Sequence, residues 1–61
     1  MSERITIIIE TDNAAFDDSP TGEIARILRA MADRIEVAGV PPVPKDSNGN
    51  VVGSVTVEPL V

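Results

Sequence analysis

The sequence reads SPTGEIARILRAMADRIEVAG from residue 19 to residue 39, and this stretch decides the fold. Ser19 is a favourable N-cap residue, and Pro20 suits the first position of a helix. Gly39 favours a helix end, and the prolines that follow it prevent the helix from resuming. These signals predict one helix over residues 20–37.

The apolar side chains of this helix recur at spacings that place them on one face. They are Ile24, Ile27, Leu28, Met31 and Ile35. The opposite side carries charged residues, among them Arg26, Arg29, Asp33 and Glu36. An amphipathic helix of this kind needs one apolar layer to cover its stripe, and the rest of the chain must supply that layer.

Residues 4–10, RITIIIE, predict the first strand, because β-branched side chains suit a pleated sheet. The period of two places Ile5, Ile7 and Ile9 on one face, which is expected to meet the core. Ile8 falls on the other face and leaves a large apolar side chain outside the core.

Residues 43–58, VPKDSNGNVVGSVTVE, predict a hairpin. Asn48-Gly49 accepts the positive φ angles of a tight turn. Pro44 cannot donate a hydrogen bond to a sheet, so a short strand near residues 43–45 belongs at an edge. The expected fold is α+β in a single domain over residues 1–61. It is a β-α-β-β arrangement with a three-stranded antiparallel sheet of order 1-3-2 and one helix packed on one face.

The first strand would form the second edge of this sheet, and it is rich in isoleucine and free of proline. Such an edge is a template for pairing with another chain. We therefore predict a homodimer in which two copies join as a six-stranded sheet. The residues of the expected dimer edge are Ile5, Thr6, Ile7, Ile8 and Ile9.

Composition argues against several classes of function. The chain of 61 residues has ten acidic and five basic residues, for a net charge of −5. This charge opposes direct binding to nucleic acid and permits a basic protein partner, although it also simply favours solubility. The run of five residues at 5–9, four isoleucines and a threonine, is too short for a secretory signal or a membrane helix, so we expect no membrane contact and a cytoplasmic protein.

An enzyme is not expected, because the chain has no cysteine, histidine, tyrosine or tryptophan. Asp17 and Asp18 are neighbours beside a helix start that favours their ionised forms, so neither suits a general acid. The acidic residues near the helix start, including Glu10 and Asp12, are interpreted as solvated carboxylates. A calcium loop that begins at Asp46 would need glycine and glutamate where this chain has Val51 and Val57, so residues 46–50 are interpreted as a plain turn. We predict no metal and no cofactor.

Three sequence blocks in order, DNAAF at 12–16, EIARILRAMADRIE at 23–36 and DSNGNVVG at 46–53, carry a resemblance. The chain resembles a group of short proteins encoded by bacteriophages and prophages. The prolines at 41, 42 and 44 depart from that pattern and are expected to shorten the second strand. The resemblance implies a phage accessory gene, and small acidic phage proteins often inhibit host defence systems, as anti-CRISPR proteins do.

On this interpretation a host protein complex is the expected partner, bound through the loop before the helix and one helix face. The residues expected to contact it are Asn13, Phe16, Asp17, Asp18, Arg26 and Arg29. Phe16, the chain's one aromatic residue, would either plug the core under the helix or anchor the partner. Two alternatives stay open, namely an oligomeric binder of a small ligand such as a signalling nucleotide, and an accessory protein of phage structure or assembly.

Overall fold

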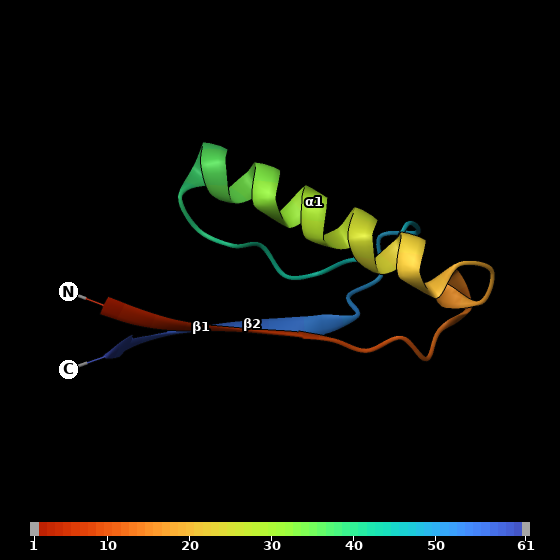
Figure 1. The fold of residues 1–61 in the computed structure, drawn as a ribbon, viewed down its shortest axis with the longest axis horizontal. Helices are drawn as coiled ribbons and strands as arrows, with labels where there is room; N and C mark the ends of the chain where they lie inside the picture. The colour runs from red at the N-terminus through yellow and green to blue at the C-terminus, as the bar shows by residue number, and fades with distance from the viewer. Residues whose placement is uncertain (1, 61) are drawn as a thin grey trace.

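The computed structural model describes residues 2–60, in which one long helix lies beside a two-stranded antiparallel ribbon (Figure 1). The elements follow in the order β1 (Ser2–Ile9), η1 (Ala14–Phe16, a 3-10 turn), α1 (Pro20–Ala38) and β2 (Gly53–Leu60). The two strands extend toward one end of the molecule, and the loop before α1 and the turn before β2 lie toward the other, which we call the loop end.

The boundaries of α1 follow from its caps. The Ser19 hydroxyl accepts a hydrogen bond from the Gly22 N–H at 3.3 Å, and Pro20 occupies the first helical turn. Gly39 has a φ of 81°, a left-handed conformation that glycine adopts without strain. Its N–H donates to the Ile35 carbonyl at 2.8 Å, which closes the helix. The helix ends one residue later than predicted.

In the ribbon, Ile5 lies opposite Val57, Ile7 opposite Val55 and Ile9 opposite Gly53. The two strands approach so closely at Gly53 that a Cβ atom there would overlap the carbonyl oxygen of Ile8. Glycine is therefore the residue that this pairing requires.

The prediction of a three-stranded sheet is wrong, because the sheet has two strands. Residues 43–45 form no strand and contribute one isolated bridge, between Lys45 and Val51. The physical reason is the run of prolines at 41, 42 and 44, which lack the N–H groups that a ladder needs. Both long edges of the ribbon are consequently open, and pairing of two copies through β1 would give four strands, not six.

The core is small and lies at the loop end of the molecule. It consists of buried Phe16, Ile27, Met31 and Val52, with Pro44 also buried, and partly buried Ile9, Ala15, Ile24 and Val55 pack against it. Phe16 is only 2% exposed, so the interpretation of this side chain as a core residue is correct.

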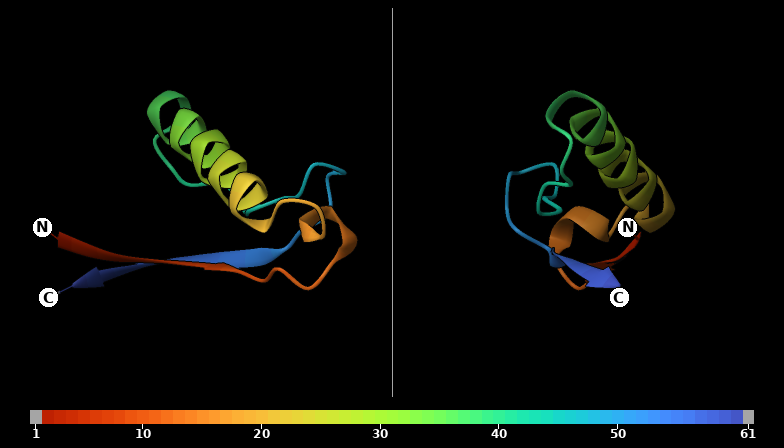
Figure 2. Two further views of the ribbon diagram at one scale, coloured as in Figure 1. Left: turned by 45° about the vertical axis from the view of Figure 1, so that its right-hand side comes forward. Right: turned by 90° about the vertical axis from the view of Figure 1, so that its left-hand side faces the viewer.

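The expectation that Ile5 and Ile7 join the core is wrong, because they are 53% and 39% exposed. Ile9, on the same face of the ribbon, packs against the core. Ile5 and Ile7 lie further along the strand, beyond the core. Figure 1 and the left view of Figure 2 both show the C-terminal end of α1 rising away from the strands. Leu28 and Ile35 of the helix are also exposed in part, at 44% and 38%.

Within residues 2–60, no helix has both the length and the apolar character needed to cross a lipid bilayer.

Candidate functional site

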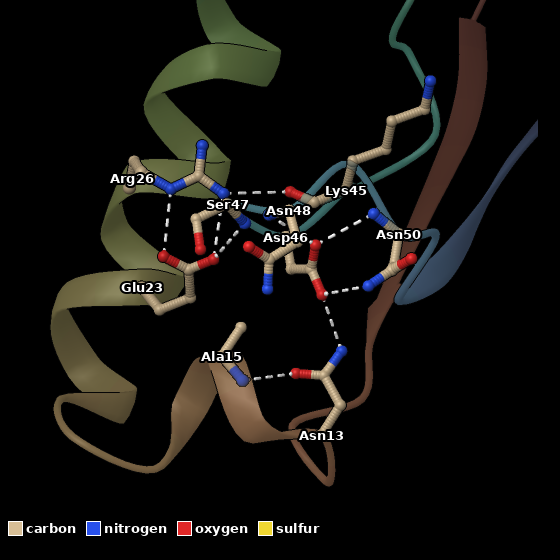
Figure 3. A network of polar contacts seen from close by, with 9 residues as sticks. All are labelled: Asn13, Ala15, Glu23, Arg26, Lys45, Asp46, Ser47, Asn48 and Asn50. Carbon is tan, nitrogen blue, oxygen red and sulfur yellow. Dashed lines mark hydrogen bonds and ion pairs between the residues drawn. The ribbon is translucent and has the colours of Figure 1, made fainter.

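The most highly organised polar site surrounds Asp46, a carboxylate that is only 4% exposed (Figure 3). Its Oδ1 accepts hydrogen bonds from the backbone N–H groups of Asn48 and Asn50, both at 2.9 Å. Its Oδ2 accepts from the side-chain amides of Asn13 at 2.8 Å and Asn50 at 3.3 Å. Both oxygens are thus fully engaged by groups of the protein.

These hydrogen bonds determine the charge of Asp46. Burial by itself would raise the pKa of the carboxyl, since it disfavours the ionised form. The hydrogen bonds from Asn50, Asn13 and Asn48 outweigh burial, and the pKa lies below its ordinary value. Asp46 is therefore ionised at neutral pH and has no proton to donate in catalysis.

The same aspartate shapes the turn between the proline segment and β2. The Gly49 N–H donates to the Asp46 carbonyl at 3.0 Å, and the Asp46 N–H donates to the Asn50 carbonyl at 2.9 Å. Gly49 has a φ of 84°, while no residue other than glycine has a positive φ among the described residues. The expected tight turn is present, with the positive φ angle at Gly49 and not at Asn48.

A second group of contacts joins this turn to the start of α1. Arg26 forms a two-pronged ion pair with Glu23, with Nε to Oε1 and Nη2 to Oε2 both at 3.0 Å. The Glu23 carboxylate also accepts from the Ser47 N–H at 2.8 Å, and Arg26 donates to the Lys45 carbonyl at 3.1 Å. Glu23 and Arg26 thereby clamp the helix to the turn, as Figure 3 shows.

Hydrogen bonding to Arg26 lowers the pKa of Glu23, with the Ser47 N–H adding to the effect and partial burial opposing it. Pairing with Glu23 likewise raises the pKa of Arg26. The pair is fully ionised at neutral pH. Among residues 2–60 it is the only ion pair, so Arg29 and Asp33, although four positions apart on α1, do not pair.

A groove of about 380 Å³ lies between α1 and the segment 42–49. From the helix it is lined by Arg26, Ile27, Ala30, Met31 and Arg34, and from the segment by Pro42, Val43, Lys45, Asp46, Ser47 and Gly49. Its volume falls in the range of small-ligand pockets. Three of the five basic residues of the chain line this one groove.

The residues predicted to contact a partner differ in exposure and in their contacts. Asn13 caps η1 by accepting a hydrogen bond from the Ala15 N–H at 2.9 Å, and it also holds Asp46. Phe16 is buried in the core. Asp17 and Asp18 are exposed beside η1.

The two arginines of the predicted set also differ in position. Arg26 lines the groove and holds the turn, whereas Arg29 is exposed on α1 and is not part of the groove lining. Of the predicted dimer edge, Ile5, Thr6, Ile7 and Ile8 are exposed and Ile9 is partly buried.

Sequence reasoning missed the Asp46 site and the groove. It treated residues 46–50 as a plain turn, although an aspartate that precedes a Ser-Asn-Gly-Asn run is placed to bond its own backbone. A signal for the groove was the spacing of Arg26, Ala30 and Arg34 by four, which aligns them along one side of α1. The bond between Asn13 and Asp46 had no local signal.

Within residues 2–60, no three acidic side chains lie close enough together to hold a metal ion. No protein-family model matches the chain, and neither a curated protein nor a solved structure is significantly similar to it.

Proposed function

We propose that this chain is a small phage-encoded binding protein that acts in the cytoplasm of the infected cell, as a homodimer, by blocking a component of host defence through protein–protein contacts. The assignment to a phage and to host defence rests on the resemblance of the three sequence blocks. The assignment to binding rests on the exposed surface of the fold.

The observation that carries the proposal is an excess of exposed apolar side chains. Among residues 2–60, eleven large apolar side chains are exposed, while the core contains four buried ones. The exposed set is Ile5, Ile7, Ile8, Leu28, Ile35, Val37, Val40, Val43, Val51, Val57 and Leu60. Larger apolar patches on a protein surface mark sites of association.

The position of these side chains supports the homodimer. Ile5, Ile7 and Val57 project from one face of the ribbon, beyond the reach of the small core. A two-stranded ribbon is marginally stable by itself and needs further strands or a helix packed on it, and α1 covers only the part of this ribbon near Ile9 and Val55. Pairing of β1 with β1 of a second copy would supply those strands and extend the apolar face.

The oligomeric state tests the homodimer directly. Light scattering during size-exclusion chromatography should give twice the chain mass of 6.4 kDa at micromolar concentration. Ile7→Lys should shift the protein to monomer, because it places a charge on the apolar face. Thr56→Lys is the matched control, since Thr56 lies on β2, away from the β1 edge and on the opposite face of the ribbon, and it should remain a dimer. A 6.4 kDa particle for the unmodified chain would refute the homodimer.

The inhibitory role is tested in cells. The chain is expressed in bacterial strains that each carry one defence system, and the plating efficiency of a phage restricted by that system is measured. Rescue of plating in one strain, with capture of the corresponding complex by the tagged chain, is the expected result. Absence of rescue in every strain, together with co-purification of the chain with virions, would instead favour the assembly role.

A further inference from the structure

The groove between α1 and residues 42–49 has a charge opposite to that of the whole molecule. The chain carries a net charge of −5, yet Arg26 and Arg34 line one wall of the groove and Lys45 the other. Figure 3 shows the Lys45 ammonium directed away from the Arg26 guanidinium, so the positive charge is distributed and not focused at one point. Arg34 has no ion-pair partner among residues 2–60.

Small and aliphatic side chains also line the groove. Ala30 lies between Arg26 and Arg34 on α1, and a spacing of four residues corresponds to about 6 Å along a helix. The small side chain of Ala30 leaves room between the two arginines, and Ile27, Met31 and Val43 complete an aliphatic lining. A ligand that fits must therefore present apolar surface as well as negative charge.

The opposite wall offers free backbone groups. Within the described part of the chain, no hydrogen bond involves the backbone of Val40, Pro41, Pro42 or Val43. The N–H and carbonyl groups of Val43 therefore remain available beside the groove. An extended peptide can pair with such groups, as when a strand is added to an open edge.

Two features disfavour a nucleotide or another polyphosphate. Glu23 is paired with Arg26, and the negative charge of Asp46 also acts on Arg26, so the charge of the three cationic side chains is offset in large part. The resulting weak positive charge suits separate carboxylates better than a phosphate chain. In addition, the only aromatic side chain, Phe16, is buried in the core, so the groove has no ring on which a base could stack.

We propose that this groove binds an extended acidic segment of the protein partner, in which an aspartate or glutamate alternates with an aliphatic residue. The carboxylate contacts Arg34 and the free part of the Arg26 guanidinium, and the aliphatic side chain lies over Ala30 and Val43. This inference rests on the proposed function as a binding protein, because it describes the chemistry of the partner.

The test is an NMR titration of the ¹⁵N-labelled chain with three probes. These are a blocked Val-Glu-Leu-Glu-Val peptide, its Val-Gln-Leu-Gln-Val counterpart and guanosine monophosphate. The acidic peptide should shift the amide signals of Ala30, Arg34, Val43 and Lys45, and its affinity should fall as salt is added. Equal binding of the glutamine peptide, preference for the nucleotide, or no shift at millimolar acidic peptide would overturn the inference.

Variants separate the groove from other surfaces. Arg34→Glu should weaken binding of the acidic peptide by about tenfold or more, since it replaces attraction with repulsion. Arg29→Glu is the matched control on the same helix outside the groove, and it should bind as the unmodified chain does. Equal weakening in both variants would show only a long-range charge effect and would overturn the groove as the site. The amide spectra of both variants show whether the fold is intact.

The two proposals can fail independently. If Arg34→Glu loses the peptide but still rescues phage plating, the groove is not the inhibitory contact, and the proposed function stands. If no defence system is inhibited but the acidic peptide still binds at the groove, the proposed function fails while the binding site stands.

Discussion

The side-chain amide of Asn13 donates a 2.8 Å hydrogen bond to the Asp46 carboxylate, which lies 33 positions further along the chain. This bond joins the loop that precedes α1 to the turn that precedes β2. It closes the loop end of the molecule around Phe16 and Val52, two of the four side chains in the core.

The Asn13–Asp46 bond should contribute measurably to stability. Asn13→Ala removes a donor to a charged and buried acceptor, and hydrogen bonds to charged groups contribute about 1.5–3 kcal/mol. The free energy of unfolding in urea at neutral pH should fall by that amount. Asp12→Ala, a change at an exposed neighbouring position, serves as the control and should have little effect. Equal stability of the two variants would contradict a structural role for the bond.

Stability should decrease in acid because of Asp46 and Glu23. The pKa values of both carboxyls are lowered in the folded state from ordinary values of 3.8 and 4.5. A lowered pKa means that the stabilisation is complete above the unfolded value and is lost as the pH falls through the folded value. Unfolding followed by circular dichroism should therefore show a loss of stability that begins near pH 4.5 and deepens below it.

The variant Asp46→Asn tests the share of Asp46 in this acid response. It keeps the size of the side chain but cannot ionise, so its stability should be lower at neutral pH and should vary less between neutral and acidic conditions. A pH profile parallel to that of the unmodified chain would show that Asp46 does not contribute.

Gly53→Ala should be strongly destabilising. The added methyl group would overlap the Ile8 carbonyl, so the two strands must separate at the point where the ribbon leaves the core. A cost of about 3 kcal/mol is expected, at the upper end for overpacking. Ser54→Ala, at the next position of β2, has an exposed side chain and should change stability little. Urea unfolding of the two variants measures the difference.

The depth of the core can be tested at two adjacent helix positions. Ile27 is 1% exposed and Leu28 is 44% exposed. Ile27→Ala should lower the free energy of unfolding by about 2–5 kcal/mol, because it removes buried methyl groups and leaves a cavity. Leu28→Ala should cost about 1 kcal/mol or less. Similar losses at both positions would contradict the structure, because they would mean that Leu28 is buried as fully as Ile27.

Local signals accounted for the helix. Ser19, Pro20 and Gly39 act through contacts within a few residues, so the sequence contains the whole of their effect. The third strand was not predictable in the same way, because its pairing depended on whether residues 43–45 could offer N–H groups to a neighbour. Because the prolines lack N–H groups and Asp46 makes its bonds within the turn, residues 43–45 do not form a strand.

The sequence by itself determined the amphipathic helix, its ends, the apolar face of the ribbon and the absence of the side chains on which most catalysis depends. Only the tertiary structure decided how far those apolar faces meet. Because α1 and the ribbon diverge, Ile27 is buried while Ile5 and Ile7 are exposed, although all three belong to faces that the sequence pattern assigns to the core. Tertiary structure also brought Arg26, Arg34 and Lys45 to one groove, since that arrangement depends on where the chain returns after α1 and not on any local preference.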